Sequence, residues 1–431
     1  MSLLLGPDKQ GFTLVTAERT ARPAQRPATT GAPTRPAQRP ATTGAPGSIA
    51  SFGQGARPAG STDVALDCHD CHLEPGRVNA HTHIYSGLAP LGMPEPEVPP
   101  ENFVQILERI WWRLDRALDE ESLRASARYY AAEALLAGTT TLIDHHESPS
   151  FIDGSLDVLA DACQEMGIRA VLCYGATERN CGRQEARRGL AECRRFLRTN
   201  QRSLIEGVVA LHASFTVSDE TIAEAAEICR DQDTVMHVHV SEDLADVTDA
   251  EERGYIGPLE RLLDFDALPP GSILAHCVHC GTSQVSMADG QGLWIVQNPR
   301  SNRGNRVGYP GGLGSSARVA IGTDGYPANM DDEALALDEE ATTHNEDLGA
   351  ARRRLSGGHL LAGERLGLTL APLAASHTAD VVAINQGRVR HVVVDGNLVV
   401  KDGQLMTADL TEIRAHAREQ APLLWKRMEN Y

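Results

Sequence analysis

The sequence lacks the features that would place the protein in or across a membrane. No apolar run approaches the ~20 residues that a helix needs to span a bilayer, and the N-terminal MSLLLGPDKQ has no basic segment followed by an apolar one. The nine cysteines are an odd number scattered along 431 residues, which does not suggest a disulfide framework. We therefore expect a protein of the reducing cytoplasm with no membrane partner.

Basic residues are also scarce. The 40 lysines and arginines face 58 aspartates and glutamates, which leaves a formal net charge of −18. A surface of that sign repels a phosphate backbone, so we expect no nucleic-acid partner. A hydrophobic share of 42% and a charged share of 23% are those of an ordinary globular protein.

A duplicated segment near the N-terminus has the composition of a chain without a core of its own. RPAQRPATTGAP occupies residues 22–33 and returns unchanged at 35–46. A segment so rich in proline, alanine and threonine buries too little apolar surface to order itself. Two copies are also too few for a stacked repeat fold. We interpret this segment as a linker or surface loop that interrupts the strands expected there.

Short apolar runs alternate with helical patterns from Val78 onward. One such pattern covers residues 103–118, where Phe103, Ile106, Ile110 and other apolar residues fall on one stripe. Eight strands that alternate with helices are typical of a (β/α)₈ barrel, which usually has ~250 residues. The eight runs are 78-VNAHTH, 140-TTLID, 170-AVLCY, 208-VVALH, 235-VMHVHV, 272-SILAHC, 294-WIVQN and 319-VAIGTD.

The two ends of the chain read as further strands. Near the C-terminus 379-ADVVAIN runs almost directly into 388-RVRHVVVDG, and the strand-like run 391-HVVVDGNLVVKDG contains an Asp-Gly turn. We expect both ends to pair into one small β-sandwich beside the barrel, with a short C-terminal half. The predicted α/β organisation is residues 1–75 and 371–410 for the sandwich, 76–370 for the TIM barrel and 411–431 for a C-terminal helix.

The segment 235-VMHVHVSED-243 places two histidines on one face of a predicted strand. In a barrel, alternate side chains of a strand face the interior, so His237 and His239 both point inward. His239 is nearer the catalytic rim and Glu242 lies just past the strand end. We expect His237, one layer deeper, to support the site from behind.

Other strand ends supply similar side chains. A single His-x-His pair carries little information, because lone histidines on apolar strands usually belong to the core. Four separate strand ends that each supply a nitrogen or a carboxylate oxygen are what a divalent cation of the zinc class requires, and iron, manganese or nickel would suit the same donors. The strand-end donors are His81, His83, His239, His276 and Asp324.

These motifs together resemble the amidohydrolase superfamily, in its aminohydrolase and chlorohydrolase branch. The resemblance rests on HxH in the first strand, HxxE in the fifth, AHCVH in the sixth and TDG in the eighth. The sequence is most similar to SsnA-type aminohydrolases associated with selenium metabolism. That similarity is carried by 83-HIYSGL, 110-IWWRLDRALDEESL, 145-HHESP, 154-GSLDVL, 300-RSN, 307-VGY and 322-GTDG.

The resemblance implies roles for these residues. Glu242 would shuttle protons, and His276 would polarise the attacking water or steady the tetrahedral intermediate. Asp324 would also accept a proton from that water. The metal ligands would be His81, His83, His239 and Asp324. Substrate-binding residues would be His212, Tyr85, Ser86, His145 and His146.

The scarcity of lysine bears on the number of metal ions. Binuclear members of the superfamily commonly bridge two ions with a carbamylated lysine on strand four. This chain has only Lys9, Lys401 and Lys426, all outside the predicted barrel. We therefore expect one divalent ion, with zinc first, a small-molecule substrate and, by family habit, a homodimer.

Three functions remain open at this point. The first is deamination of an amidine-like or N-heterocyclic small molecule. The second is hydrolytic loss of chloride or an alkylamine from a related ring, although a halide needs no proton from Glu242 as it leaves. The third is a catalytically silent scaffold. The presence of every predicted metal ligand argues against it. Loops decide the substrate, and the sequence does not identify it.

Overall fold

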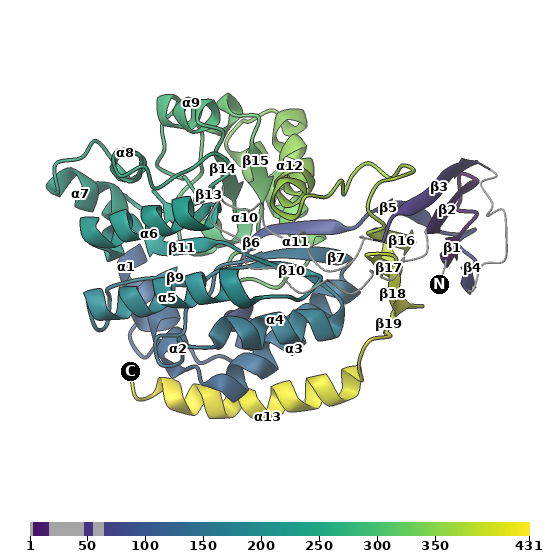
Figure 1. The fold of residues 1–431 in the computed structure, drawn as a ribbon, viewed down its shortest axis with the longest axis horizontal. Helices are drawn as coiled ribbons and strands as arrows, with labels where there is room; N and C mark the ends of the chain where they lie inside the picture. The colour runs from purple at the N-terminus through teal and green to yellow at the C-terminus, as the bar shows by residue number, and fades with distance from the viewer. Residues whose placement is uncertain (1–2, 17–46, 55–63) are drawn as a thin grey trace, which may run out of the picture.

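A computed structural model describes residues 3–16, 47–54 and 64–431, and the duplicated segment lies outside them. The described chain forms a barrel of parallel strands wrapped by helices, with two further sheets at one end, one mixed and one antiparallel (Figure 1). The predicted (β/α)₈ barrel with a β-sandwich built from both chain ends is confirmed. Among the described residues no helix combines the length and apolarity needed to cross a bilayer.

The barrel strands follow one another in chain order. They are β6 (Arg77–Thr82), β7 (Thr139–Asp144), β8 with β9 (Arg169–Leu172, Gly175–Ala176), β10 with β11 (Ile205–Gly207, Val209–Ala213), β12 (Met236–Val240), β13 (Ile273–His276), β14 (Trp294–Gln297) and β15 (Val319–Ile321). The third and fourth strands are each broken into two pieces, and their pieces pair with one another, β10 with β8 and β11 with β9. The barrel closes where Thr82 meets Asp324 in a parallel bridge.

A close approach of backbones permits that closure. Gly322 follows β15, and a Cβ placed there would lie 2.5 Å from the carbonyl oxygen of His81 and 2.6 Å from Oδ1 of Asn298. The amide of Asp324 donates to the same His81 carbonyl over 3.0 Å. Only glycine leaves room for the last strand to lie against the first.

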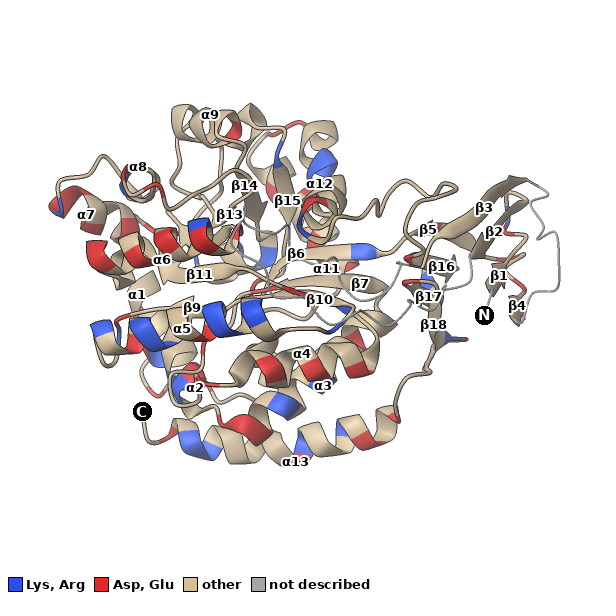
Figure 2. Cartoon of the chain, viewed as in Figure 1, with Lys and Arg blue, Asp and Glu red and all other residues tan. Residues whose placement is uncertain are grey.

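The helices cover the outside of the barrel. They are α3 (Glu120–Leu136), α4 (Ser155–Met166), α5 (Arg183–Thr199), α6 (Asp219–Gln232), α7 (Leu244–Glu252), α8 (Pro258–Asp264), α9 (Thr282–Gly290), α10 (Pro299–Gly304), α11 (Met330–Thr343), α12 (Leu348–Leu366) and α13 (Leu410–Met428). The last of these lies along α3 at the bottom of Figure 1. Acidic and basic side chains are interspersed over α6 and α13 (Figure 2).

The helix predicted over residues 103–118 is interrupted. It consists of α1 (Phe103–Ile106), a π-helical turn η3 (Leu107–Trp111) and α2 (Trp112–Ala117). A π turn inserts an extra residue and rotates the side chains that follow it, and such turns are frequent at functional sites. Here it turns Leu107 and Trp111 toward the pocket described below.

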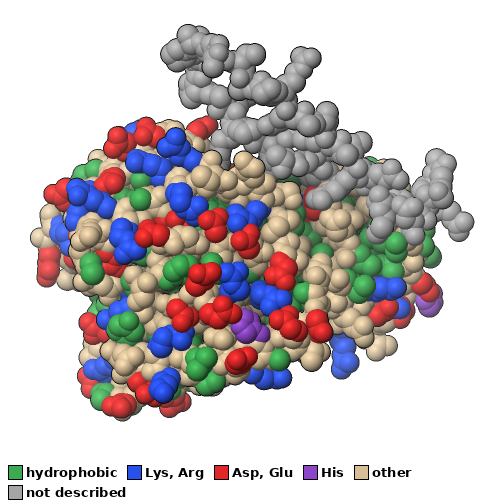
Figure 3. All heavy atoms as spheres, turned by 60° about the horizontal axis from the view of Figure 1, so that its bottom comes forward, with side chains coloured by type: hydrophobic (Ala, Val, Ile, Leu, Met, Phe, Trp, Pro, Cys, Tyr) green, Lys and Arg blue, Asp and Glu red, His purple; other side chains and the backbone are tan. Residues whose placement is uncertain are grey.

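The satellite consists of two sheets. One has the order β3-β2-β1-β4 and the other β19-β18-β17-β16-β5. Their bounds are β1 (Leu3–Leu5), β2 (Phe12–Thr16), β3 (Ile49–Gln54), β4 (Val64–Leu66), β5 (His72–Pro75), β16 (Val381–Asn385), β17 (Arg388–Val394), β18 (Asn397–Lys401) and β19 (Gln404–Leu405). Figure 3 shows apolar side chains gathered at this end, whereas the barrel face in view carries mixed charges.

Tight turns join the strands in the C-terminal half of the sandwich. The predicted Asp-Gly turn joins β17 to β18, with Asp395 at φ 52° and Gly396 at φ 75°. Gln386 and Gly387, at φ 49° and 76°, join β16 to β17 in the same way. Two consecutive positive φ values define the type I′ turn that suits a two-residue hairpin.

A buried ion-pair network ties the satellite to the barrel. Arg169 on β8 is 3% exposed. Its Nε lies 2.7 Å from Oδ2 of Asp380, and one of its terminal nitrogens lies 2.9 Å from Oδ1 of Asp395. The amide of Gly47 also donates to Asp395 over 2.7 Å. One guanidinium thus fixes three segments that are far apart in the sequence.

We expect Arg169→Ala to lower the free energy of unfolding by ~3–5 kcal/mol, because it removes the cation that neutralises two buried carboxylates. The exposed pair of Arg124 with Glu120 gives a matched control, since Arg124→Ala should cost less than ~1 kcal/mol. Urea unfolding followed by circular dichroism measures both. Equal losses for the two variants would contradict the role of the network.

Candidate metal centre and active site

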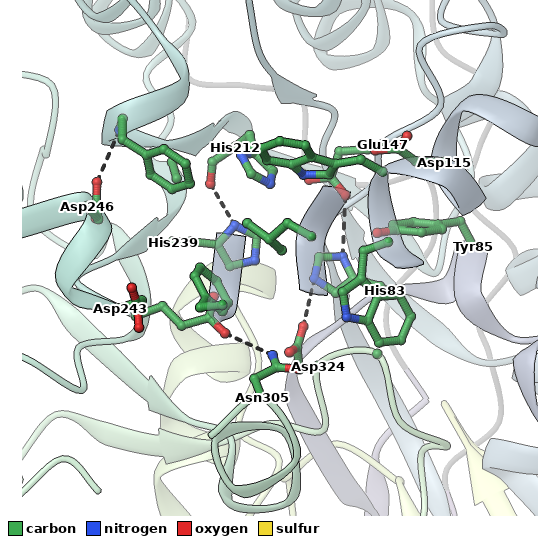
Figure 4. Close-up of a pocket in the computed structure, with 18 residues that line it drawn as sticks. His83, Tyr85, Asp115, Glu147, His212, His239, Asp243, Asp246, Asn305 and Asp324 are labelled. Carbon is green, nitrogen blue, oxygen red and sulfur yellow. Dashed lines mark hydrogen bonds and ion pairs between the residues drawn. The ribbon is translucent and has the colours of Figure 1, made fainter. Parts of the chain in front are cut away.

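Five side chains converge at the carboxyl ends of the barrel strands. His81 and His83 come from the end of β6, His239 from β12, His276 from the last residue of β13 and Asp324 from the turn after β15. All five are buried, with exposed fractions between 0 and 8%. His83, His239 and Asp324 face one another across the pocket in Figure 4.

The backbone at two of these positions is strained. His276 has φ 74° and Asp324 has φ 53°, in a region that residues with a side chain seldom adopt. Each follows the end of its strand, where the chain turns sharply away from the barrel axis. Such strain persists where the surrounding structure enforces it, and it is concentrated at functional sites.

The donor atoms lie at separations that suit one cation. The ligand atoms of His81, His239, His276 and Asp324 all lie within 4.8 Å of one another. Nε2 of His83 lies 2.8 Å from Oδ1 of Asp324. Nε2 of His81 is fully buried, has no hydrogen-bond partner and lies 3.5 Å from the same Asp324 oxygen. Imidazoles with one carboxylate are a donor set for zinc-class cations.

Hydrogen bonds from the protein fix which imidazole nitrogen is free. Nδ1 of His83 donates to the carbonyl oxygen of His145 over 2.5 Å. Nδ1 of His239 donates to the carbonyl oxygen of His212 over 2.6 Å. A carbonyl oxygen can only accept, so each ring carries a proton on Nδ1 and turns Nε2 toward the centre, where this nitrogen is the one available to a cation.

Burial tunes the charges of the ligands. It lowers the pKa of His81 to about 3 and the pKa of His239 well below its usual value, so both rings are neutral, as metal ligands must be. Burial alone would raise the pKa of Asp324, but contacts with His81 and His83 outweigh it and hold this pKa well below its usual range. Asp324 therefore supplies the negative charge of the site.

Glu242 stands across from these ligands. Its Oε1 accepts a hydrogen bond from Nδ2 of Asn305 over 3.1 Å, and its Oε2 lies 3.5 Å from Nε2 of His276. Burial, opposed by His276 and aided by the charge of Asp324, raises the pKa of Glu242 to about 7. A carboxyl group with this pKa can both take up and release a proton near neutral pH.

The chain is similar to known proteins over most of its length. A model of the amidohydrolase family matches residues 73–399. The chain belongs to the amidohydrolase family. The predicted resemblance is thereby confirmed, and with it the prediction of a metal-dependent hydrolase.

Curated relatives of this amidohydrolase include deaminases. A 5'-deoxyadenosine deaminase of Methanopyrus kandleri is 29% identical over 82% of this chain and 86% of its own. A 5-methylthioadenosine/S-adenosylhomocysteine deaminase of Natronomonas pharaonis is 29% identical over 85% and 90%. These names describe the relatives.

Solved structures share the fold. An adenosine deaminase from Xanthomonas campestris with bound zinc superposes with a TM-score of 0.78 at 19% identity, covering 100% of this chain and 98% of its own. An atrazine chlorohydrolase from Arthrobacter aurescens, complexed with zinc, gives 0.73 at 20% identity, covering 88% and 93%. At such identities the likeness bears on architecture alone.

Two of the predicted substrate-binding residues line the pocket of this amidohydrolase. His212, which is 8% exposed, lies near the end of β11, and Tyr85 lies in the 3₁₀ turn η1 (Ile84–Ser86) after β6. Burial lowers the pKa of His212 well below its usual value, so its ring is neutral. A neutral imidazole and a phenol can each donate or accept a hydrogen bond from a substrate.

The other three lie behind the pocket wall. Oγ of Ser86 donates to the carbonyl of His83 over 2.8 Å. Nδ1 of His145 lies 2.7 Å from Oε1 of Glu147, and its Nε2 lies 3.1 Å from the carbonyl oxygen of Leu211. Nε2 of His146 lies 2.8 Å from Oγ of Ser148. Because none of the three lines the pocket, the geometry does not support direct substrate contact for Ser86, His145 or His146.

The sequence did not single out Glu147. This carboxylate is 2% exposed and lines the pocket beside Tyr85 and His83 (Figure 4). Burial alone would raise its pKa, but His145 outweighs burial and holds the pKa of Glu147 below its usual range. Its position in 145-HHESP, directly after two histidines at a strand end, was the available signal.

A polar corner of the pocket also went unpredicted. Asp115 on α2 pairs with Arg179 over 2.7 Å, and the guanidinium of Arg179 lies 4.8 Å from the ring centre of Trp112. Oδ1 of Asp115, Nη1 of Arg179 and Nε1 of Trp112 are buried without hydrogen-bond partners. Buried polar atoms are rarely left unpaired, so this corner has spare donors and an acceptor for a ligand.

We expect the purified protein to bind one divalent ion per chain, with His239→Ala reducing metal content by at least tenfold because a ligand is removed. His344 is the control: its side chain is 44% exposed and lies outside the cluster, so His344→Ala should keep full metal content. Plasma mass spectrometry after dialysis measures both. Full occupancy in His239→Ala would contradict the assignment of this ligand.

Proposed function

We propose that this amidohydrolase deaminates an adenosine derivative modified at the 5' carbon. Water replaces the exocyclic amine on the purine ring, and ammonia leaves. The 5'-deoxyadenosine and 5-methylthioadenosine deaminases among its relatives support the substrate class. The observation that carries the proposal is Glu242, a buried carboxyl poised near neutral pKa at the mouth of the ligand cluster.

Glu242 supplies the proton transfers that deamination needs. An amine leaves a ring carbon readily only once it is protonated, and the incoming water must lose a proton. A carboxyl group with a pKa of about 7 exchanges protons in both directions without a large energetic penalty. Asn305 and His276 hold Glu242 in place from its two oxygens.

The ligand cluster supports a metal-assisted hydrolysis, with zinc as our first choice. When bound, the cation supplies a Lewis acid that makes water a nucleophile near neutral pH. His81, His83, His239 and Asp324 would hold the cation. Asp324 is ionised and can receive the first proton, while Nε2 of His276 faces Glu242 and can steady the oxygen of the intermediate.

The pocket walls suit a flat ring with polar substituents. Tyr85, Phe103, Trp111, Trp112 and Phe215 line it with aromatic surface. Asp115 and Trp112, which line the pocket, offer an unpaired acceptor and an unpaired donor that hydroxyl groups can satisfy. This combination supports a nucleoside over a bare base.

The rival functions have less support. Loss of chloride would leave Glu242 without a use as proton donor. A catalytically silent scaffold does not require five potential metal-donor side chains buried around one point. A cytoplasmic location and a homodimer remain predictions, and all nine cysteines are free thiols, as a reducing compartment favours.

The substrate is tested by measuring ammonia release from zinc-loaded protein across a panel. We expect the largest kcat/KM for 5'-deoxyadenosine and 5'-methylthioadenosine, with adenosine next and cytosine, guanine and chlorinated triazines far below. Ammonia release from guanine or cytosine in preference to every adenosine derivative would contradict the proposed substrate class. Chloride release from a triazine would favour the rival hydrolase.

We expect Glu242→Gln to lower kcat by ~10²–10⁴, because the amide cannot carry protons between water and the leaving amine. Metal content should be unchanged, since Glu242 is not among the proposed ligands. Glu251→Gln, an exposed change on α7, is the matched control and should keep full activity. Activity of Glu242→Gln within a few-fold of the control would contradict this role.

A further inference from the structure

One of the three histidine ligands is held differently from the other two. His83 and His239 each donate Nδ1–H to a backbone carbonyl. Nδ1 of His81 instead lies 2.9 Å from Nε2 of His237, which is the histidine two residues before His239 on β12. The acceptor behind this ligand is therefore a second imidazole. The paired histidines of 235-VMHVHVSED-243 thus contact two different sides of the centre.

The role of His81 as a ligand fixes which group donates and which accepts in each hydrogen bond behind it. If Nε2 of His81 gives its lone pair to a cation, its proton lies on Nδ1 and is donated to Nε2 of His237. The proton of His237 then lies on Nδ1, 3.7 Å from Sγ of Cys173. The thiol of Cys173 donates in turn to the carbonyl oxygen of Asp144, at 3.1 Å.

This chain of contacts is sealed from water. His81, His237, Cys173 and Asp144 each have an exposed fraction of 0%. Because Nε2 of His237 accepts the hydrogen bond from His81, the ring of His237 is neutral, and water cannot replace either contact. A buried donor without its acceptor costs ~1–3 kcal/mol, so the arrangement is strongly specified.

We propose that His237 is a positioning residue that fixes the tautomer and ring orientation of His81, and that Cys173 extends this support to the backbone of β7. The proposal rests on the proposed role of His81 as a metal ligand, but not on the identity of the substrate. A neutral imidazole withdraws the ligand's proton less than a carboxylate would, so His81 donates less electron density and the cation stays more electrophilic.

The test compares two variants of His237 by metal affinity. His237→Leu removes the acceptor and should weaken zinc affinity ~10–100-fold, as loss of an outer partner typically does. His237→Gln places an amide oxygen near the position of Nε2 and should restore most of that affinity. Competition with a chromophoric zinc chelator gives the dissociation constants. The absorption spectrum of the cobalt-substituted protein should shift in His237→Leu and return toward wild type in His237→Gln.

A second pair of variants covers the case in which His237→Leu does not fold. Cys173→Ala removes the thiol that His237 contacts, whereas Cys163→Ala removes an equally buried thiol on α4 outside the chain of contacts. Zinc affinity should fall and the cobalt spectrum should change in Cys173→Ala relative to Cys163→Ala. Thermal unfolding confirms that each variant is folded before its affinity is compared.

Two results would overturn the proposal. One is a folded His237→Leu protein with wild-type zinc affinity and an unchanged cobalt spectrum. The other is identical affinities and spectra for Cys173→Ala and Cys163→Ala, which would remove Cys173 from the support. Failure of the wild-type protein to bind zinc or cobalt at all would instead overturn the metal assignment, and failure to deaminate any compound would leave this proposal standing.

Discussion

Closure of the barrel between β6 and β15 is the constraint on which the site depends. The two strands are separated by most of the catalytic domain in sequence, yet the bridge of Thr82 with Asp324 brings their ends into register. Gly322 makes this possible by admitting the carbonyl of His81 where a side chain would clash. Without this contact, the carboxylate of the site would not reach the histidines of the first strand.

The orientation of each proposed histidine ligand is then fixed by a hydrogen bond to a group outside the ligand cluster. Two of the histidines are fixed by backbone carbonyls and one by a buried imidazole. Two of these acceptors come from the end of the adjacent barrel strand, and the third comes from β12, across the barrel from β6, so the fold itself sets the tautomers. Burial keeps the rings of His81 and His239 neutral, while Asp324 keeps its charge through its contacts with His81 and His83. The same burial raises the pKa of Glu242 and so prepares it for proton transfer.

The sequence was sufficient to predict elements whose signal is local. Short apolar runs separated by helical patterns located the eight strands, and the period of two predicted that His237 lies beneath His239. Features that depend on contacts between residues far apart in the sequence could not be predicted from local patterns. The pairing of Arg169 with Asp380 joins residues that no local pattern relates. Glu147 enters the pocket only because of how the chain turns after β7, and the π turn η3 interrupts a stripe that reads as one regular helix.

The central claim is that one cation is held where the ends of β6, β12 and β15 meet, opposite Glu242. An X-ray structure of zinc-loaded crystals, with anomalous data collected on both sides of the zinc absorption edge, tests it most directly. The account predicts a single anomalous peak bonded to His81, His83, His239 and Asp324, with Glu242 facing it across the pocket. A peak at the cysteines instead, or a second peak between His145 and Glu147, would contradict it.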